Sequence, residues 1–279
     1  MIKNLTEIIQ NALSEDLDES GDVTSSATMG EDTTGTAEII AKEDGILAGG
    51  FVVEKVFNLL DSLISVDIKF DDGASVRNRD VVFVINGPMR GILIGERTAL
   101  NLLCRMSGIA TLTSKFVKLT EGTGVKVLDT RKTTPGLRSL EKYAVRVGGG
   151  FNHRIGLFDM VLIKENHIAA ANGISNAVKL SRSYLKEHEL DLKIEVECRK
   201  LEEVREAVEL DVDRIMLDNM NVDQITQAVR LVNGRKKLEI SGGVNLDNVA
   251  EYAKTGVDYI SVGQLTHSAR AMDFSLLVK

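Results

Sequence analysis

The sequence predicts a mixed α/β protein with an N-terminal α+β sandwich and a C-terminal, incomplete parallel (β/α) barrel. From Val125 onward, apolar strands alternate with helices, and the last strands recur roughly every twenty residues, as in a (β/α) barrel. About six such strands can be counted, whereas a full barrel has eight. A doubly wound open sheet is the alternative architecture. We expect a first domain at 1–115, including a linking helix, and a second at 116–279, whose last residues could return to the first.

The first half of the chain alternates short helices with strands. Leu5, Ile9 and Leu13 belong to a set of apolar residues at helical spacing, and the stretch 18–28 that follows is polar and rich in turn-forming residues. Beyond it we expect a strand at Thr36–Lys42, a helix at Phe51–Leu60, strands at Ile64–Phe70 and Val81–Ile85, and a mostly helical segment from Arg90 to Gly122.

The second half repeats a unit of strand, loop and helix. The expected strands are centred near Val127, Leu162, Val196, Met216, Ile240 and Ile260. The expected helices are Leu137–Val147, Ile174–His188, Leu201–Leu210, Val222–Val232 and Leu246–Lys254.

Basic residues gather where two of these strands end. Seven Lys or Arg residues fall within 129–167, although the whole chain carries a formal charge of -7. Ligands of α/β proteins bind at the carboxyl ends of strands, and Arg grips carboxylate or phosphate with paired hydrogen bonds. A pocket with these cations suits a small ligand that has several negative charges: Arg131, Lys132, His153, Arg154 and Lys164. An ordinary surface cluster is the alternative, but we expect these side chains to be buried, where unpaired cations are costly.

Acidic and glycine-rich positions follow the later strands. Glu195 and Glu197 lie two apart on one strand and therefore point to the same side, and Asp218 ends the next strand. A phosphate cradle of backbone N–H groups is expected at Ser241, Gly242, Gly243 and Gly263.

Several of these positions also have a purely structural reading. Glu195 could be the buried partner of a barrel Lys, and the glycines could simply form turns. The helix face with Arg138, Lys142 and Arg146 is expected to be solvated. His167 could cap a loop or act in the site, and His267 could join the phosphate site or cap the last helix.

Composition narrows the classes of function. Hydrophobic residues make up 43% and charged residues 27%, as in globular proteins, and no apolar run reaches membrane-spanning length. Net acidity argues against nucleic-acid binding. Cys104 and Cys198 are too few for a disulfide framework and lack metal-ligand spacing. Because the first residues do not resemble a signal peptide, we expect a cytoplasmic protein.

The sequence blocks resemble one enzyme family. DTRKTTPG, GGGFNHRIGL, KENH, EVE, LDN, SGG and SVGQLTHS are similar to the nicotinate-nucleotide pyrophosphorylase family, also called quinolinate phosphoribosyltransferase, in the same order along nearly the whole chain. The family has an incomplete barrel, which would explain the missing strands. Family members usually carry Gly where this chain has Arg79.

The resemblance implies an activity and residue roles. The family transfers phosphoribosyl from phosphoribosyl pyrophosphate to quinolinate, with Mg²⁺, and releases carbon dioxide and pyrophosphate to give nicotinate mononucleotide for NAD synthesis. Matching positions imply that Arg131, His153 and Arg154 hold quinolinate, Lys132 and Lys164 lie near both substrates, Glu197 and Asp218 lie near ribose and Mg²⁺, and Ser241–Gly243 with Gly263 hold the 5′-phosphate. Lys132, Lys164, Glu197 and Asp218 are the catalytic candidates. Arg97 matches a residue that reaches into a neighbouring subunit, which implies a homodimer or larger homo-oligomer.

Three other functions are compatible with part of this pattern. Lys164 at a strand end beside a phosphate site would also suit a Schiff-base aldolase or lyase. A non-catalytic sensor of a phosphorylated metabolite would not need both Glu197 and Asp218. A pyrophosphorylase-like protein associated with molybdate transport has similar DTRKT and HR blocks, but KENH and SGG are closer to the quinolinate enzymes.

Overall fold

The computed structural model describes residue 2 and residues 4–279, which group into two compact units. The first unit contains the chain up to Ser114, then Thr133–Gly149 and Ser268–Lys279, and the second contains Lys115–Lys132 and Gly150–His267. Two later segments therefore group with the first unit; the expectation allowed this for the last residues of the chain but not for Thr133–Gly149.

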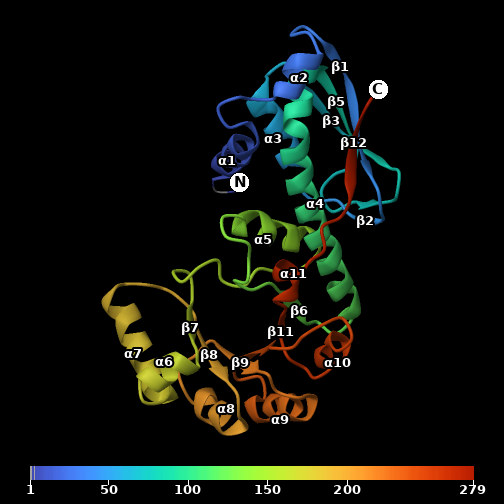
Figure 1. Ribbon diagram of the computed structural model, residues 1–279. Helices are drawn as coiled ribbons and strands as arrows, with labels where there is room; N and C mark the ends of the chain where they lie inside the picture. Colours follow the sequence, from blue (N-terminus) through green and yellow to red (C-terminus); the bar gives the residue numbers. More distant parts are fainter. Residues whose placement is uncertain (1, 3) are drawn as a thin grey trace. The chain divides into compact units, whose positions relative to one another are not determined.

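The first unit is built on a four-stranded antiparallel sheet (Figure 1). Its strand order is β12-β1-β5-β3, so the last strand of the chain lies beside the first. The elements are α1 (Leu5–Leu17), α2 (Val23–Thr28), β1 (Thr34–Ala41), β2 (Gly45–Ile46), α3 (Gly50–Leu60), β3 (Ser65–Ile68), β4 (Ser75–Val76), β5 (Val81–Pro88), α4 (Met89–Leu119), which continues into the second unit, α5 (Arg138–Val147) and β12 (Phe274–Val278).

Alternating side chains of β1 supply part of the core of this unit. Ala37, Ile39 and Ala41 are fully buried, while the residues between them are more exposed. This alternation is what a strand with one face on the core requires.

A short helix replaces the turn expected within 18–28. α2 begins after Asp22, whose carboxylate accepts the backbone N–H of Ser25 at 2.9 Å. An N-cap of this kind satisfies one of the free N–H groups at a helix start. A polar stretch of this composition is thus compatible with a short, capped helix as well as with a turn.

The prediction of a solvated face on α5 is wrong at its middle residue. Lys142 is only 2% exposed, whereas Arg138 is half-buried and Arg146 is exposed. The neighbouring Glu141 is also buried and accepts hydrogen bonds from the guanidinium of Arg105. Lys142 therefore lies in the packed interior of the first unit, although its spacing from Arg138 and Arg146 predicted an exposed, charged helix face.

The second unit is a six-stranded parallel sheet (Figure 1). Its elements are β6 (Lys126–Leu128), β7 (Val161–Ile163), α6 (Glu165–Ala170), α7 (Ile174–Glu187), β8 (Ile194–Cys198), α8 (Leu201–Val208), β9 (Arg214–Asp218), α9 (Val222–Val232), β10 (Lys237–Ser241), α10 (Val249–Ala253), β11 (Tyr259–Ser261) and α11 (Gln264–His267).

The strand order identifies the barrel rather than the doubly wound sheet. The order is β6-β11-β10-β9-β8-β7, so strands follow one another around the sheet and β6 pairs with the last of them. A doubly wound sheet would instead reverse direction at a switch point. The sheet would close on itself if β6 also paired with β7, a pair that is absent among the described residues. The fold class expected from the sequence, an α+β domain and an incomplete parallel barrel, is confirmed.

Within the described part of the chain, no helix is both long and apolar enough to cross a membrane.

Candidate active site

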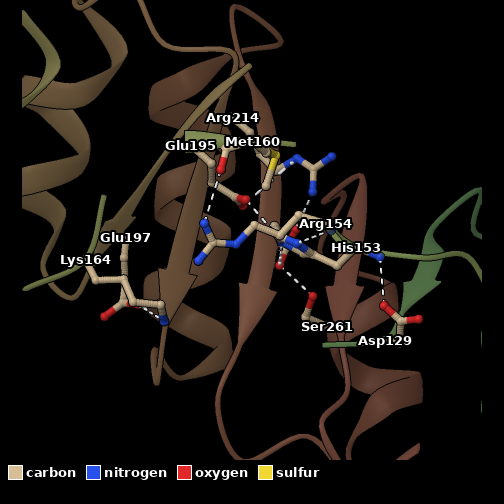
Figure 2. Close-up of polar contacts among 10 residues, drawn as sticks. Asp129, His153, Arg154, Met160, Lys164, Glu195, Glu197, Arg214 and Ser261 are labelled. Carbon is tan, nitrogen blue, oxygen red and sulfur yellow. Dashed lines mark hydrogen bonds and ion pairs between the residues drawn. The ribbon is translucent and has the colours of Figure 1, made fainter. Parts of the chain in front are cut away.

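The candidate site lies in the parallel sheet of the second unit, in two groups that Figure 2 shows. Lys164 lies beside Glu197 at the carboxyl ends of β7 and β8, which the parallel direction of the strands brings to one edge. His153 and Arg154 lie near Glu195, which is the second residue of β8 and therefore lies toward the amino end of that strand.

Asp129 fixes the segment that carries His153. Its carboxylate accepts the backbone N–H of His153 at 2.8 Å and the side-chain amide of Asn152 at 2.6 Å (Figure 2). The backbone of Phe151 also bonds to Val127 and Asp129, so it extends the edge of β6. A buried carboxylate thus anchors the segment that carries His153 through two hydrogen bonds.

His153 faces two carboxylates inside the barrel. Its Nε2 atom lies 3.1 Å from Glu195 Oε2 and 3.4 Å from Glu239 Oε1, and both acids are 0% exposed. Burial would lower the pKa of His153, but the two carboxylates outweigh burial and raise it to about 9.

The two acids titrate differently because their partners differ. Burial, together with the charge of Glu239, raises the pKa of Glu195 to about 7. Burial acts in the same direction on Glu239, but His153 and Arg214 lower its pKa below the ordinary value. Arg214 Nη1 lies 2.5 Å from Glu239 Oε2, and the hydroxyl of Ser261 donates to Glu239 Oε1 at 2.6 Å.

Arg154 is half-buried beside this cluster. Its backbone N–H donates to His153 Nδ1 at 2.7 Å, and its guanidinium donates to the Met160 carbonyl at 3.1 Å. Burial, followed by the charge of Arg131, lowers the pKa of Arg154. The two guanidiniums therefore repel each other, and an anion between them would relieve that repulsion.

Lys164 is held at the end of β7 by an acid and a histidine. Its ammonium lies 2.9 Å from Glu197 Oε2 (Figure 2). Its backbone N–H donates to His167 Nδ1 at 2.9 Å, which caps the start of α6. Of the two roles considered for His167, the structure therefore shows the capping contact.

Arg199 joins the two acidic positions. Its guanidinium lies 3.5 Å from Asp218 Oδ2 and 3.9 Å from Glu197 Oε1, and it also pairs with Glu165. Arg199 directly follows the strand that carries both glutamates, so its position just beyond a strand end is the sequence signal for this contact.

The glycine-rich turns lie against the other strand ends. The backbone N–H of Asn219, which follows Asp218, donates to the Ser241 carbonyl at 2.8 Å. Gly242 has φ +93° and packs so closely that an added Cβ would lie 2.2 Å from Asn219 Oδ1, whereas a Cβ at Gly243 would meet nothing within 4 Å. The turn therefore has one packed side and one open side.

Gly263 brings two further predicted residues together. A Cβ at Gly263 would lie 3.0 Å from Lys132 Cδ and 3.2 Å from His267 Cδ2. Thr266 also donates to the Lys132 carbonyl at 2.8 Å, so Lys132 lies against the turn between β11 and α11.

Two expectations need correction. Of the five cations expected to be buried, His153 is buried and Arg154 is half-buried, while Arg131, Lys132 and Lys164 are exposed. Arg97 lies in the first unit on α4 with its side chain 65% exposed, and its reach into a neighbouring subunit stays a prediction.

The second correction concerns the partners of Glu195, which are His153 and Arg214 rather than a barrel lysine. Glu239 is buried in the same cluster and was missed, although an acid between Leu238 and Ile240 in an apolar strand is itself a signal.

Two sets of side chains could be considered for a metal. Glu197 and Asp218 offer carboxylate oxygens at strand ends, the ligand type that Mg²⁺ prefers. Both already contact cations, which an incoming metal would partly replace. His153, Glu195 and Glu239 also place ligand atoms within 4.8 Å of one another. There Arg214 and His153 already compensate the two acids, so these side chains form an ionic cluster in this structure.

Comparison with known proteins gives one consistent result. Residues 22–107 match the N-terminal domain of quinolinate phosphoribosyl transferase, and residues 109–277 match its C-terminal domain. A mitochondrial quinolinate phosphoribosyltransferase [decarboxylating] 2 of Nicotiana glauca is 44% identical over 99% of this chain and 82% of its own length. A probable nicotinate-nucleotide pyrophosphorylase [carboxylating] of Bacillus subtilis is 43% identical over 92% of this chain and 87% of its own. The crystal structure of nicotinate-nucleotide pyrophosphorylase from Ehrlichia chaffeensis superimposes with a TM-score of 0.95 at 39% identity, covering 100% of both chains.

Proposed function

Because this chain belongs to the quinolinate phosphoribosyl transferase family, we propose that it transfers phosphoribosyl from phosphoribosyl pyrophosphate to quinolinate with loss of carbon dioxide. The product is nicotinate mononucleotide, a precursor of NAD. Besides the family match over both domains, one observation supports this function. Charged groups suited to a dianionic acid and a sugar phosphate lie in the barrel: Lys164 pairs with Glu197 and Arg199 with Asp218 at strand ends, and the guanidinium of Arg154 is repelled by that of Arg131.

Arg131, His153 and Arg154 would bind quinolinate in this proposal. A carboxylate between Arg131 and Arg154 would be held by charged hydrogen bonds and would remove their mutual repulsion. Holding the 3-carboxylate in this way leaves the 2-carboxylate free to depart. Lys132 and Lys164 would place further positive charge near both substrates.

Glu197 and Asp218 would lie at the ribose end of the site. They would hold Mg²⁺, which neutralises charge on pyrophosphate when it is bound. The N–H groups of Ser241, Gly242, Gly243 and Gly263 would receive the 5′-phosphate, with His267 and Lys132 beside them. The open side of Gly243 suits the close approach of a phosphate.

The reaction itself needs no protein nucleophile. The pyridine nitrogen attacks C1 of the ribose, and the bond from C1 to pyrophosphate breaks. The 2-carboxylate then leaves as carbon dioxide because the positive ring nitrogen stabilises the electron pair left behind, and a proton takes its place. Alignment of two reactants can lower a barrier by about 7–11 kcal/mol. Positioning and electrostatic stabilisation therefore supply the catalysis.

Lys164 is poorly suited to the rival Schiff-base chemistry. Imine formation requires a neutral amine, whereas the Lys164 ammonium is paired with Glu197 at 2.9 Å. Cys198 follows Glu197 in the chain. Burial raises the pKa of its thiol, so the thiol does not act as a thiolate nucleophile.

A coupled assay tests the proposed function. Purified protein with quinolinate, phosphoribosyl pyrophosphate and Mg²⁺ is expected to form nicotinate mononucleotide, while nicotinate in place of quinolinate gives no product. Arg154→Ala should raise the KM for quinolinate about tenfold or more, since a charged hydrogen bond contributes about 1.5–3 kcal/mol. Arg235→Ala, which removes an exposed guanidinium from the same unit, is the matched control. Unchanged quinolinate kinetics in Arg154→Ala would refute the assignment.

The assembly is proposed to be a homodimer or larger homo-oligomer in which Arg97 completes the neighbouring subunit's site. Arg97→Ala and Lys164→Met should each be inactive alone. A refolded equal mixture should regain about one quarter of wild-type activity, because one of the two sites in each mixed dimer is intact. No regain would show that Arg97 does not act across subunits. We also propose that the protein works in the cytoplasm, on small molecules rather than on nucleic acid or a membrane.

A further inference from the structure

We infer that Glu195, Glu239, Ser261 and Arg214 form a positioning network that runs through the barrel and sets the orientation of His153, and through it that of Arg154. The inference rests on the proposed function only for its kinetic consequence. These four side chains contact the protein interior, so none of them is proposed to touch the substrate.

The network is a continuous chain of charged contacts. Arg214 Nη1 lies 2.5 Å from Glu239 Oε2, and Arg214 Nε lies 4.0 Å from Glu195 Oε1. The other oxygens of these two acids face His153 Nε2, at 3.4 Å from Glu239 and 3.1 Å from Glu195. The guanidinium also stacks on the ring of Tyr259, with 4.0 Å from its central carbon to the ring centroid. Each acid therefore contacts both Arg214 and His153, and Figure 2 shows this for Glu195.

This arrangement determines which ring nitrogen of His153 carries a hydrogen toward the acids. In the neutral ring, Nδ1 accepts the backbone N–H of Arg154 at 2.7 Å and Nε2 carries the hydrogen on the side of Glu195 and Glu239; protonation adds a hydrogen at Nδ1 and gives up the contact with Arg154. Rotation of the ring would break both contacts at once. Because the Arg154 backbone is itself a partner of the ring, an error in the ring position moves Arg154 as well.

The burial of the network indicates why two acids are retained in an apolar sheet. Glu195 and Glu239 are 0% exposed, and the hydroxyl of Ser261 adds a hydrogen bond to Glu239 at 2.6 Å. Burying two carboxylates costs free energy unless cations compensate them. A core of apolar residues would avoid that cost, so the acids are best explained by the histidine they orient.

Glu239→Gln tests the inference because it keeps the shape and removes the charge. The KM for quinolinate should rise about tenfold or more, while the KM for phosphoribosyl pyrophosphate changes less than about twofold. If Glu239→Gln does not fold, Ser261→Ala weakens the same carboxylate contact and should move the quinolinate KM in the same direction. Glu209→Gln, which breaks an exposed pair with Arg235 at 2.8 Å, is the matched control and should leave both constants unchanged.

A second measurement does not depend on substrate. The ring of His153 is faced by Glu195 and Glu239, with Arg214 beyond them and with Asp129 and Arg154 contacting its own segment. NMR titration of the His153 ring should show its midpoint falling by about one pH unit or more in Glu239→Gln, because a nearby carboxylate favours the charged ring.

The two measurements separate the possible failures. An unchanged titration together with an equal rise in both KM values would overturn the network. If the wild-type protein does not turn over quinolinate but the titration still shifts, the proposed function fails and the network stands.

Discussion

Removal of Arg214, which faces both buried acids, should destabilise the barrel in a way that depends on pH. Arg214 is 16% exposed at its side chain and pairs with Glu239 at 2.5 Å, with Glu195 at 4.0 Å. Arg214→Leu keeps an apolar side chain against Tyr259 but leaves two acids to be compensated by His153 alone among the groups named in this cluster.

The magnitude follows from the burial of these acids. Breaking a buried ion pair by removing one partner costs about 3–5 kcal/mol, because a buried charge loses its compensation. Without Arg214, the pKa of Glu239 should rise, since Arg214 is one of the groups that lower it. A carboxyl whose pKa is raised in the folded state stabilises that state below its unfolded value of about 4.3 and loses this contribution as pH rises through the folded value. Relative to wild type, the variant should therefore lose about 1–3 kcal/mol less of its folding free energy at pH 5 than at pH 8, since one pKa unit corresponds to about 1.4 kcal/mol.

Hydrogen exchange at amides of β8, β9 and β10 is the suitable assay, because two compact units need not unfold together. The free energy of opening is measured for wild type and variant at pH 5 and pH 8. Arg235→Leu is the control, since it breaks an exposed pair with Glu209 at 2.8 Å that should contribute less than about 1 kcal/mol at either pH. A loss of equal size at both pH values would refute the assignment of buried, charged acids, and so would a loss no larger than that of the control.

Three further substitutions test local features of the fold. Arg79 has φ +78°, a left-handed conformation that strains a residue with a side chain. Arg79→Gly should remove this strain and raise the free energy of unfolding of the first unit by about 1 kcal/mol in a denaturant titration. A decrease would show that the backbone at Arg79 is not strained. Gly242→Ala should cost at least about 2 kcal/mol by hydrogen exchange and raise the KM for phosphoribosyl pyrophosphate, because its Cβ would lie 2.2 Å from Asn219 Oδ1. Gly234 has φ +72° and open space around it, so Gly234→Ala measures the cost of backbone strain alone. Its loss of stability should be smaller than that of Gly242→Ala. Asp22→Ala should lower the free energy of unfolding by about 1 kcal/mol through loss of the cap of α2, and Asp22→Asn should restore most of it.

The element pattern of the second unit was readable from the sequence because it is local. Helix Val222–Val232 has the expected bounds, and the other expected helices differ at their ends by a few residues. Short elements were harder to predict. The helices Val23–Thr28 and Glu165–Ala170 depend on side-chain caps from Asp22 and His167 more than on apolar periodicity.

The positions of the candidate residues along the strands were also predictable. Asp129, Lys164 and Asp218 come where apolar runs end, and strands that run in parallel bring such ends to one edge. Their exposure was not predictable, because it depends on which elements pack around each strand end. Lys164 is 49% exposed at its side chain although it follows a buried strand.

By itself, the sequence determined the fold class, the order of helices and strands along the chain, and the polar residues that lie at the strand ends. These features depend on the pattern of residues close together in the sequence. Only the tertiary structure decided that Lys142 is buried and that His153 is paired with Glu195 and Glu239. The physical reason is that burial and charge pairing are set by groups far apart in the sequence, which periodicity does not encode.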